Sequence, residues 1–217
     1  MKMLISSSAN RVIDVLKRSD GHWQTLDLIA PVFSLFAFGE LRNQFTSATG
    51  SRLIIPSLQA ASLLGGRSER TYRNGLKVQW LAKECATWLS QNAQVRLADS
   101  APETSALLWE QSGSQNAIIG ANPLSTAGLG LTPGKASALT QQAETDEEYA
   151  ALKRWFEEQW VLLPETETLL EQLRSIGSYA SPEMLYHTIL YAIFKKLGEE
   201  LDEERIVRSA TGIKDTI

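Results

Sequence analysis

The chain has few of the residues from which common catalytic and metal sites are built. Among its 217 residues there is one cysteine, Cys85, and there are two histidines, His22 and His187. A single cysteine excludes an internal disulfide framework, and two histidines far apart in the sequence make no recognisable zinc site. We therefore expect no metal and no cofactor, and we predict that Cys85 is a small buried side chain in a helix.

Long apolar runs are also missing. No apolar stretch approaches the roughly 20 residues of a membrane-spanning helix, and the first five residues lack the apolar region of a signal peptide. The lone cysteine suits a reducing compartment, so the sequence predicts a cytoplasmic protein without membrane association. Nucleotide-binding loops are absent too, because no hydroxyl residue follows Lys135 and because Pro123 stands where a dinucleotide-binding helix would begin.

The charged residues are unevenly distributed. The net charge of −4 divides into +6 for residues 1–98 and −10 for residues 99–217. Such asymmetry is typical either of a nucleic-acid-facing half beside an acidic half, or simply of solvated helix faces. If the segment around residue 70 is helical, four cations share one side and predict phosphate contacts, although Gly75 weakens a helix there. These cations are Arg67, Arg70, Arg73 and Lys77.

The order of apolar patterns predicts an α/β chain. We expect strands at 25–30, 52–56, 94–98, 105–110 and 116–120, with another between 136 and 142. Helices are expected at 10–18, 31–38, 76–90, 146–160, 169–176 and 182–197. The helix after Thr145 should begin with a capping box and bury one face, formed by Tyr149, Leu152, Phe156 and Trp160.

This order of elements predicts a mixed, partly parallel sheet flanked by helices and followed by a C-terminal helical segment. We expect an α/β domain at 1–143, helices packed on it at 144–198, and an acidic tail or linker at 199–217.

One stretch resembles a known family. Gly120-Ala-Asn-Pro-Leu-Ser-Thr-Ala-Gly-Leu-Gly130 is similar to the Gly-Ser-Ser-Asn-Phe-Thr-x-x-Gly-Leu-Gly element of certain phospholipase D-like domains. These are the N-terminal domains of bacterial Swi/Snf-type helicases and their defence-associated relatives. Further segments of the chain are similar to the family and occur in the same order as in the family, namely Arg11–Asp14, Phe33–Phe36, Trp80–Leu89, Leu152–Trp160 and Ser181–Tyr186. The resemblance implies a phospholipase D-like nuclease fold over nearly the whole chain.

The catalytic motif of that family is degenerate here. The family carries His-x-Lys-x4-Asp on one strand, with the histidine as nucleophile, and its lysine and a following asparagine bind phosphate. The matching positions hold Glu103, Ser105 and Glu110, and only Asn122 is retained. A carboxylate repels the phosphodiester that it would have to attack, and without the lysine no cation stabilises the transferring phosphoryl group. The resemblance therefore predicts a pseudoenzyme.

Other side chains are candidates for nucleic-acid contact. Trp109, close to the degenerate motif, and Trp23 are the tryptophans that we consider for stacking on bases. Arg52 and Arg96 flank predicted strands and are candidates for lining a groove. The turn at 120–130 is interpreted as a structural corner that contacts phosphate, if at all, through its backbone amides.

Three functions remain open on this basis. The first is a non-catalytic accessory module that binds DNA or a partner protein, such as a helicase subunit, in a helicase-linked or anti-phage defence complex. The second is an active phosphodiesterase or nuclease whose site is misidentified, with residues supplied by a second copy. The third is a dimerisation or interaction scaffold, because members of this family with a single motif commonly pair as homodimers.

Overall fold

The structure, a computed structural model, divides the chain into two compact units, Met1–Ser178 and Tyr179–Ile217. It describes residues 1–4, 11–17, 22–56, 63–64, 75–120, 124–131 and 139–178, together with 186, 190 and 191. The first unit thus includes both helices that follow residue 143. The predicted division at 143, 198 and 217 stays a prediction.

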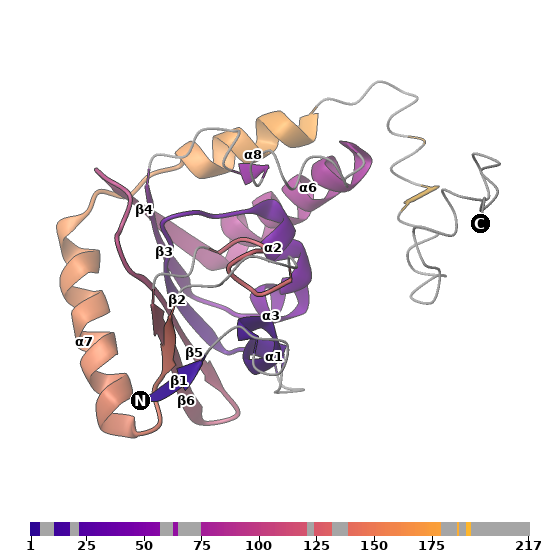
Figure 1. The fold of residues 1–217 in the computed structure, drawn as a ribbon. Helices are drawn as coiled ribbons and strands as arrows, with labels where there is room; N and C mark the ends of the chain where they lie inside the picture. The colour runs from indigo at the N-terminus through magenta and orange to yellow at the C-terminus, as the bar shows by residue number, and fades with distance from the viewer. Residues whose placement is uncertain are drawn as a thin grey trace, which may run out of the picture. The chain divides into compact units, whose positions relative to one another are not determined.

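The first unit alternates strands and helices over much of its length (Figure 1). In chain order the elements are β1 (Lys2–Leu4), α1 (Val12–Lys17), β2 (Thr25–Ile29), α2 (Leu35–Glu40), α3 (Arg42–Ser47), β3 (Ser51–Pro56), α6 (Gly75–Asn92), β4 (Ala93–Ala98), β5 (Ser105–Gln111), β6 (Ser114–Gly120), β7 (Thr140–Gln142), α7 (Asp146–Leu162) and α8 (Thr168–Ser178).

Most of the predicted elements are confirmed within a few residues at each end. Strand β1 was not predicted, because three residues are too few to show a period. Strand β7 begins only at Thr140, and residues 136–138 of the predicted strand lie outside the described residues. The predicted helix at 182–197 lies largely outside them as well. Among the described residues, no helix is long and apolar enough to cross a membrane.

Seven strands form one mixed sheet in the order β1-β7-β6-β5-β2-β3-β4. Strands β2, β3 and β4 are parallel, whereas β5, β6, β7 and β1 continue the sheet in antiparallel pairs. Beyond β4, the Leu97 N–H donates to the Pro164 carbonyl (3.1 Å) and the Thr166 N–H donates to the Val95 carbonyl (2.9 Å), so residues 164–166 cover that edge. The predicted α/β class with a partly parallel sheet is confirmed.

Helices cover both faces of the sheet. Figure 1 shows α7 on one face and α1, α2, α3 and α6 on the other. Because side chains alternate along each strand, every central strand contributes to both cores. The larger core includes Trp23, Phe38 and Phe45 on the α6 side, and Cys85 is fully buried there as predicted, where burial raises the pKa of its thiol. The predicted buried face of α7 is confirmed and packs on the alternate residues, among them Ile29 and Leu108.

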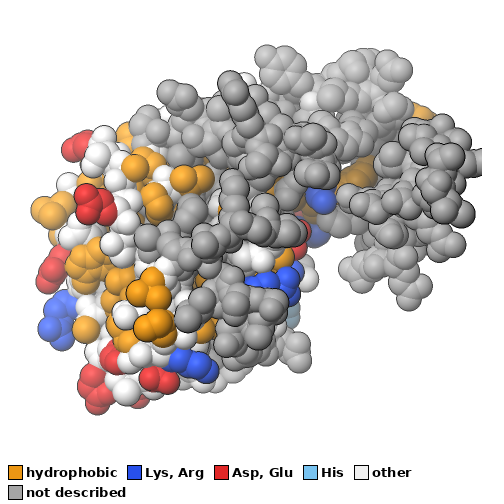
Figure 2. All heavy atoms as spheres, in the orientation of Figure 1, with side chains coloured by type: hydrophobic (Ala, Val, Ile, Leu, Met, Phe, Trp, Pro, Cys, Tyr) orange, Lys and Arg blue, Asp and Glu red, His pale blue; other side chains and the backbone are white. Residues whose placement is uncertain are grey.

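Helix α7 begins with the predicted cap. The Thr145 hydroxyl accepts from the Glu148 N–H (3.2 Å), while the Glu148 carboxylate accepts from the Glu144 N–H (2.8 Å) and pairs with the Met1 amino group. The return bond therefore reaches one residue further back than in the standard capping box. Acidic side chains in the first turn stabilise the helix, because they lie at the positive end of its dipole. Figure 2 shows Asp and Glu side chains on the surface where α7 lies.

An ion network fixes the middle of α7 to the sheet. Arg52 of β3 binds Asp27 of β2 (Nε–Oδ1 2.7 Å) and Glu157 of α7 (Nη2–Oε1 2.7 Å), and Lys153 of α7 also binds Asp27. The Arg52 guanidinium also lies 4.9 Å from the ring centroid of Phe156. Burial lowers the pKa of Arg52, but its bonds to Glu157 and Asp27 outweigh burial and raise that pKa above its ordinary value.

Replacing Asp27 with asparagine tests this network. Asp27 is 4% exposed and faces two cations, so Asp27→Asn should lower the free energy of unfolding by about 3 kcal/mol. Urea unfolding at neutral pH measures the change. The control is Glu40→Gln, which removes an exposed ion pair with Lys17 and should cost less than about 1 kcal/mol. Equal effects of the two substitutions would contradict the network's role.

Candidate functional site

The β5–β6 hairpin brings the start of β5 and the end of β6 to one edge of the sheet. Ser105 at the start of β5 lies opposite Gly120 at the end of β6, and Ala106 lies opposite Ile29 at the end of β2. Glu103 precedes β5 at the same edge, and the 124–131 turn follows β6. In α/β folds, ligands commonly bind where strands end at such an edge. Asn122 lies outside the described residues.

The turn after β6 is fixed to the turn after β2. The Leu124 N–H donates to the Val32 carbonyl (3.0 Å), and the Ser34 N–H donates to the Leu124 carbonyl (2.8 Å). Within the turn, the N–H groups of residues 128, 129, 130 and 131 all donate to Ser125, Thr126 or Ala127. Gly130 adopts φ +78°, a conformation that glycine permits. These amides already donate hydrogen bonds inside the protein. The expectation that the backbone amides of this turn contact phosphate is therefore wrong for residues 124 and 128–131.

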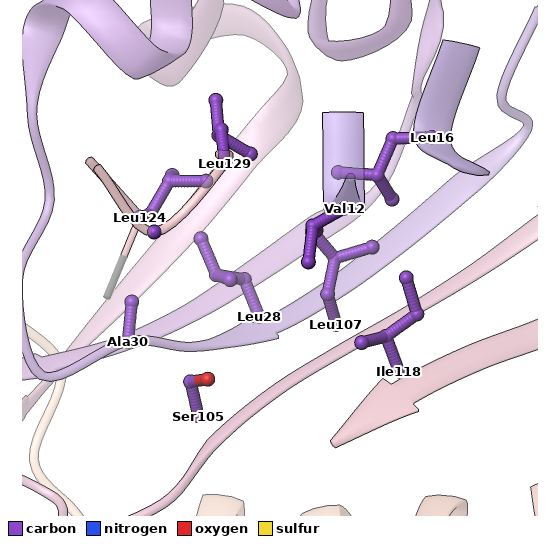
Figure 3. A pocket seen from close by; sticks show the side chains of 10 residues that line it. Val12, Leu16, Leu28, Ala30, Ser105, Leu107, Ile118, Leu124 and Leu129 are labelled. Carbon is purple, nitrogen blue, oxygen red and sulfur yellow. The ribbon is translucent and has the colours of Figure 1, made fainter. Parts of the chain in front are cut away.

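Ser105 faces the interior beneath this turn. It is 8% exposed, and its hydroxyl donates to the Gly120 carbonyl (2.7 Å). Figure 3 shows it beside a cavity of about 30 Å³ with aliphatic walls that include Leu28, Leu107 and Ile118. This volume is far below the roughly 300–1,000 Å³ of a typical ligand pocket, so the described lining forms no phosphodiester site. Ser105, the predicted counterpart of the family's lysine, therefore joins the two strands of the hairpin.

The two glutamates of the motif lie in other surroundings. Glu103 is exposed and lines a separate cleft of about 410 Å³ on the α7 side, together with Trp155. Glu110 lies near the far end of β5, opposite Thr25, where its carboxylate accepts from the Tyr149 hydroxyl of α7 (3.4 Å). Burial, then the charge of Glu110, raises the pKa of Tyr149 above its ordinary value. The structure therefore does not gather Glu103, Ser105 and Glu110 around one pocket.

No cation lines either cavity among the described residues. His22 is exposed and precedes β2 at the opposite edge of the sheet, since Thr25 pairs with Glu110. His187 lies outside the described residues. Within the described part of the chain there is also no group of three or more His, Cys, Asp or Glu that could hold a metal ion.

The structure contradicts one expectation about nucleic-acid contacts and gives two arginines a further role. Trp23 and Trp109 are 0% and 2% exposed and pack against each other with ring centroids 5.5 Å apart, so neither can stack on a base. Arg52 is held in the ion network, and Arg96 donates to the Trp160 and Leu163 carbonyls at the end of α7. Both arginines attach α7 to the sheet. Arg52 also lines a cavity of about 340 Å³ with Gly50 and Gln94, and its contact with nucleic acid stays a prediction.

Of the predicted basic stripe, Lys77 lies in the first turn of α6 and is half-buried. Arg67, Arg70 and Arg73 lie outside the described residues. Sequence reasoning missed Asp99 and Trp155, which line the 410 Å³ cleft with Glu103. The position of Asp99 directly after β4 was the available signal, because that is where parallel strands expose ligand-binding side chains.

Comparison with known proteins gives one solved structure to report. No family model and no curated protein matches the chain. The fold is similar to the crystal structure of a phospholipase D family member, Nuc from Salmonella typhimurium, at a TM-score of 0.47 and 11% sequence identity. The match covers 76% of this chain and 96% of that one. At this identity the similarity concerns the fold alone.

The end of β6 gives a test of how closely this edge is packed. A Cβ atom on Gly120 would lie 2.5 Å from the Leu139 carbonyl oxygen and 3.0 Å from the Thr140 Cα. Backbone cannot move aside easily, so Gly120→Ala should destabilise the protein by about 1–3 kcal/mol in urea unfolding. Gly39→Ala meets only the flexible Leu81 side chain, at 2.8 Å, and should cost less. A smaller loss for Gly120→Ala than for Gly39→Ala would contradict the close approach of β7.

Proposed function

We propose that this chain is a non-catalytic phospholipase D-like module that binds DNA or a partner protein. The observation that supports it best is the register of β5 and β6, which puts Ser105 directly opposite Gly120. That pairing sets the two halves of the degenerate motif side by side, as the family resemblance predicts. The positions of the nucleophile and its cation then hold an exposed carboxylate, Glu103, and a buried hydroxyl that is bonded to the strand.

Among the described residues at this edge, the groups that phosphodiester cleavage requires are missing. An attack on phosphorus needs a nucleophile of suitable charge and a cation or donor to stabilise the equatorial oxygens. Glu103 adds negative charge where the substrate is already negative. The Ser105 hydroxyl donates to Gly120, and the described residues supply no lysine, arginine or histidine to either cavity. Binding without cleavage is the function that this chemistry favours.

The setting of the module follows from the resemblance. Domains of this type precede motor domains in bacterial helicases and occur in defence-associated relatives, so we propose a helicase-linked or anti-phage defence complex. DNA would contact the cations at 67–77, of which Lys77 belongs to α6. The alternative ligand is a partner protein, and the simplest such partner is a second copy of this chain in a homodimer.

Absence of cleavage is directly testable. The purified chain, incubated with single- or double-stranded DNA and EDTA, should give no product above the Asn122→Ala variant, because Asn122 is the one retained motif residue. Denaturing gel electrophoresis measures product formation. EDTA is included because the family's chemistry uses histidine and not a metal. Cleavage by the natural chain that Asn122→Ala abolishes would show an active nuclease instead.

DNA binding should depend on salt and on the basic segment. If all four cations contact phosphate, log affinity should fall against log salt with a slope of roughly −3 to −4 for a duplex. Replacing Arg67, Arg70, Arg73 and Lys77 together with glutamine should remove most of this slope, equally for different sequences.

The matched control changes four other cations, namely Lys2, Lys83, Arg154 and Arg174, which are exposed and have no ion-pair partner among the described residues. Fluorescence anisotropy with labelled duplexes measures both variants. Equal losses would show general electrostatic attraction. A slope of log affinity against log salt near zero for the natural chain would exclude DNA as the ligand. A partner protein would then remain as the proposed ligand.

A further inference from the structure

A cleft of about 410 Å³ lies between the end of the sheet and α7. Its apolar lining includes the last residues of β2 and β4, Ile29 and Ala98, and Ile54 near the end of β3 between them. On α7 the lining includes Trp155, with Leu163 just beyond the end of the helix. The size and the apolar base are those of a site for one large side chain or a small ligand.

The polar lining of the cleft is acidic. Asp99 and Glu103 are both exposed side chains at its mouth, with Ser100 and Thr104 beside them. Neither carboxylate has an ion-pair partner among the described residues, and no cation lines the cleft there. The charge selects a cationic ligand and rejects phosphate.

The aromatic ring that lines the cleft, that of Trp155, has no described cation over it. Arginine side chains already lie over three other rings, Trp80 (4.9 Å to the centroid), Phe156 (4.9 Å) and Trp160 (4.5 Å). Trp155 is half-buried and has no cation over its ring among the described residues. A ring next to carboxylates on an apolar base suits a cation with an aliphatic stem, because the stem packs on the apolar lining while the charge meets the ring and the carboxylates.

Two exposed apolar side chains precede the cleft residue Leu163 in the sequence. Val161 and Leu162, directly before the lining residue Leu163, are 70% and 77% exposed. Two such side chains in sequence at a helix end leave apolar surface that a polypeptide can cover and a free small amine cannot. Two carboxylates are also too few for a metal site of this kind.

We propose that this cleft binds a lysine or arginine side chain of a partner protein, with apolar residues of the partner covering Val161 and Leu162. Glu103, at the former nucleophile position, then recognises a cation. An edge that handles phosphate in active relatives has the opposite charge preference in this chain.

This inference rests on the partner-protein branch of the proposed function. Its test is independent of the cleavage and DNA assays, since the peptide probe contains no phosphate. A failed peptide test therefore removes the cleft proposal and leaves the proposed non-catalytic function standing. Cleavage abolished by Asn122→Ala removes that function whatever the peptide result.

The probe is the short peptide acetyl-Gly-Arg-Leu-Leu-Gly-amide, with an otherwise identical peptide that carries citrulline, the neutral counterpart of arginine. The full chain is labelled with 5-fluorotryptophan, and Trp155→Phe assigns the Trp155 signal in the fluorine spectrum. The arginine peptide should shift that signal in a saturable manner, and the citrulline peptide should bind about tenfold more weakly.

Asp99→Asn with Glu103→Gln should weaken arginine-peptide binding about tenfold. The matched control, Asp146→Asn with Glu158→Gln, changes two exposed carboxylates of α7 that do not line the cleft, and should leave binding unchanged. Thermal unfolding confirms that both variants fold.

Three results would overturn the proposal. The first is no shift with the arginine peptide, and the second is equal affinity for arginine and citrulline peptides, which would show an apolar contact only. The third is equal displacement by spermidine at the peptide's own concentration, which would show a site for free polyamines and not for a protein side chain.

Discussion

The contact between Arg52 and two carboxylates determines how the sheet and α7 are joined. A guanidinium that is partly removed from water requires charged partners, and Asp27 and Glu157 supply them from a strand and from the helix. Residues 105 positions apart in the chain are thereby fixed to each other. Because Phe156 and Trp160 also lie against Arg52, the same residue aligns the apolar face of α7 on the sheet.

The position of α7 in turn creates the cleft at the strand ends. Trp155 is adjacent to Phe156 in sequence, so the face that packs on Arg52 also sets the direction of the Trp155 ring. Arg96 binds the carbonyls at the end of the same helix and leaves Leu163 at the cleft. A packing interaction on one face of the sheet thus shapes a potential binding surface at its edge.

The degenerate motif is divided by the geometry of its own strand. Alternation turns Ser105 toward the α6 side and Glu110 toward α7, and the length of β5 separates them further. Ser105 then stabilises the hairpin, Glu110 meets Tyr149, and Glu103 remains at the surface. Ser105 and Glu110 thus each have a local role that requires no phosphate.

The sequence by itself determined most of the longer elements, because periods of 2 and 3.6 and the cap at Thr145 are local properties. It also determined that Cys85 is buried. Only the tertiary structure decided that Trp23 and Trp109 face each other and that Arg52 belongs to a network. The same holds for the cleft that joins Asp99 to Trp155. These depend on contacts between residues far apart in the chain, which no local pattern encodes.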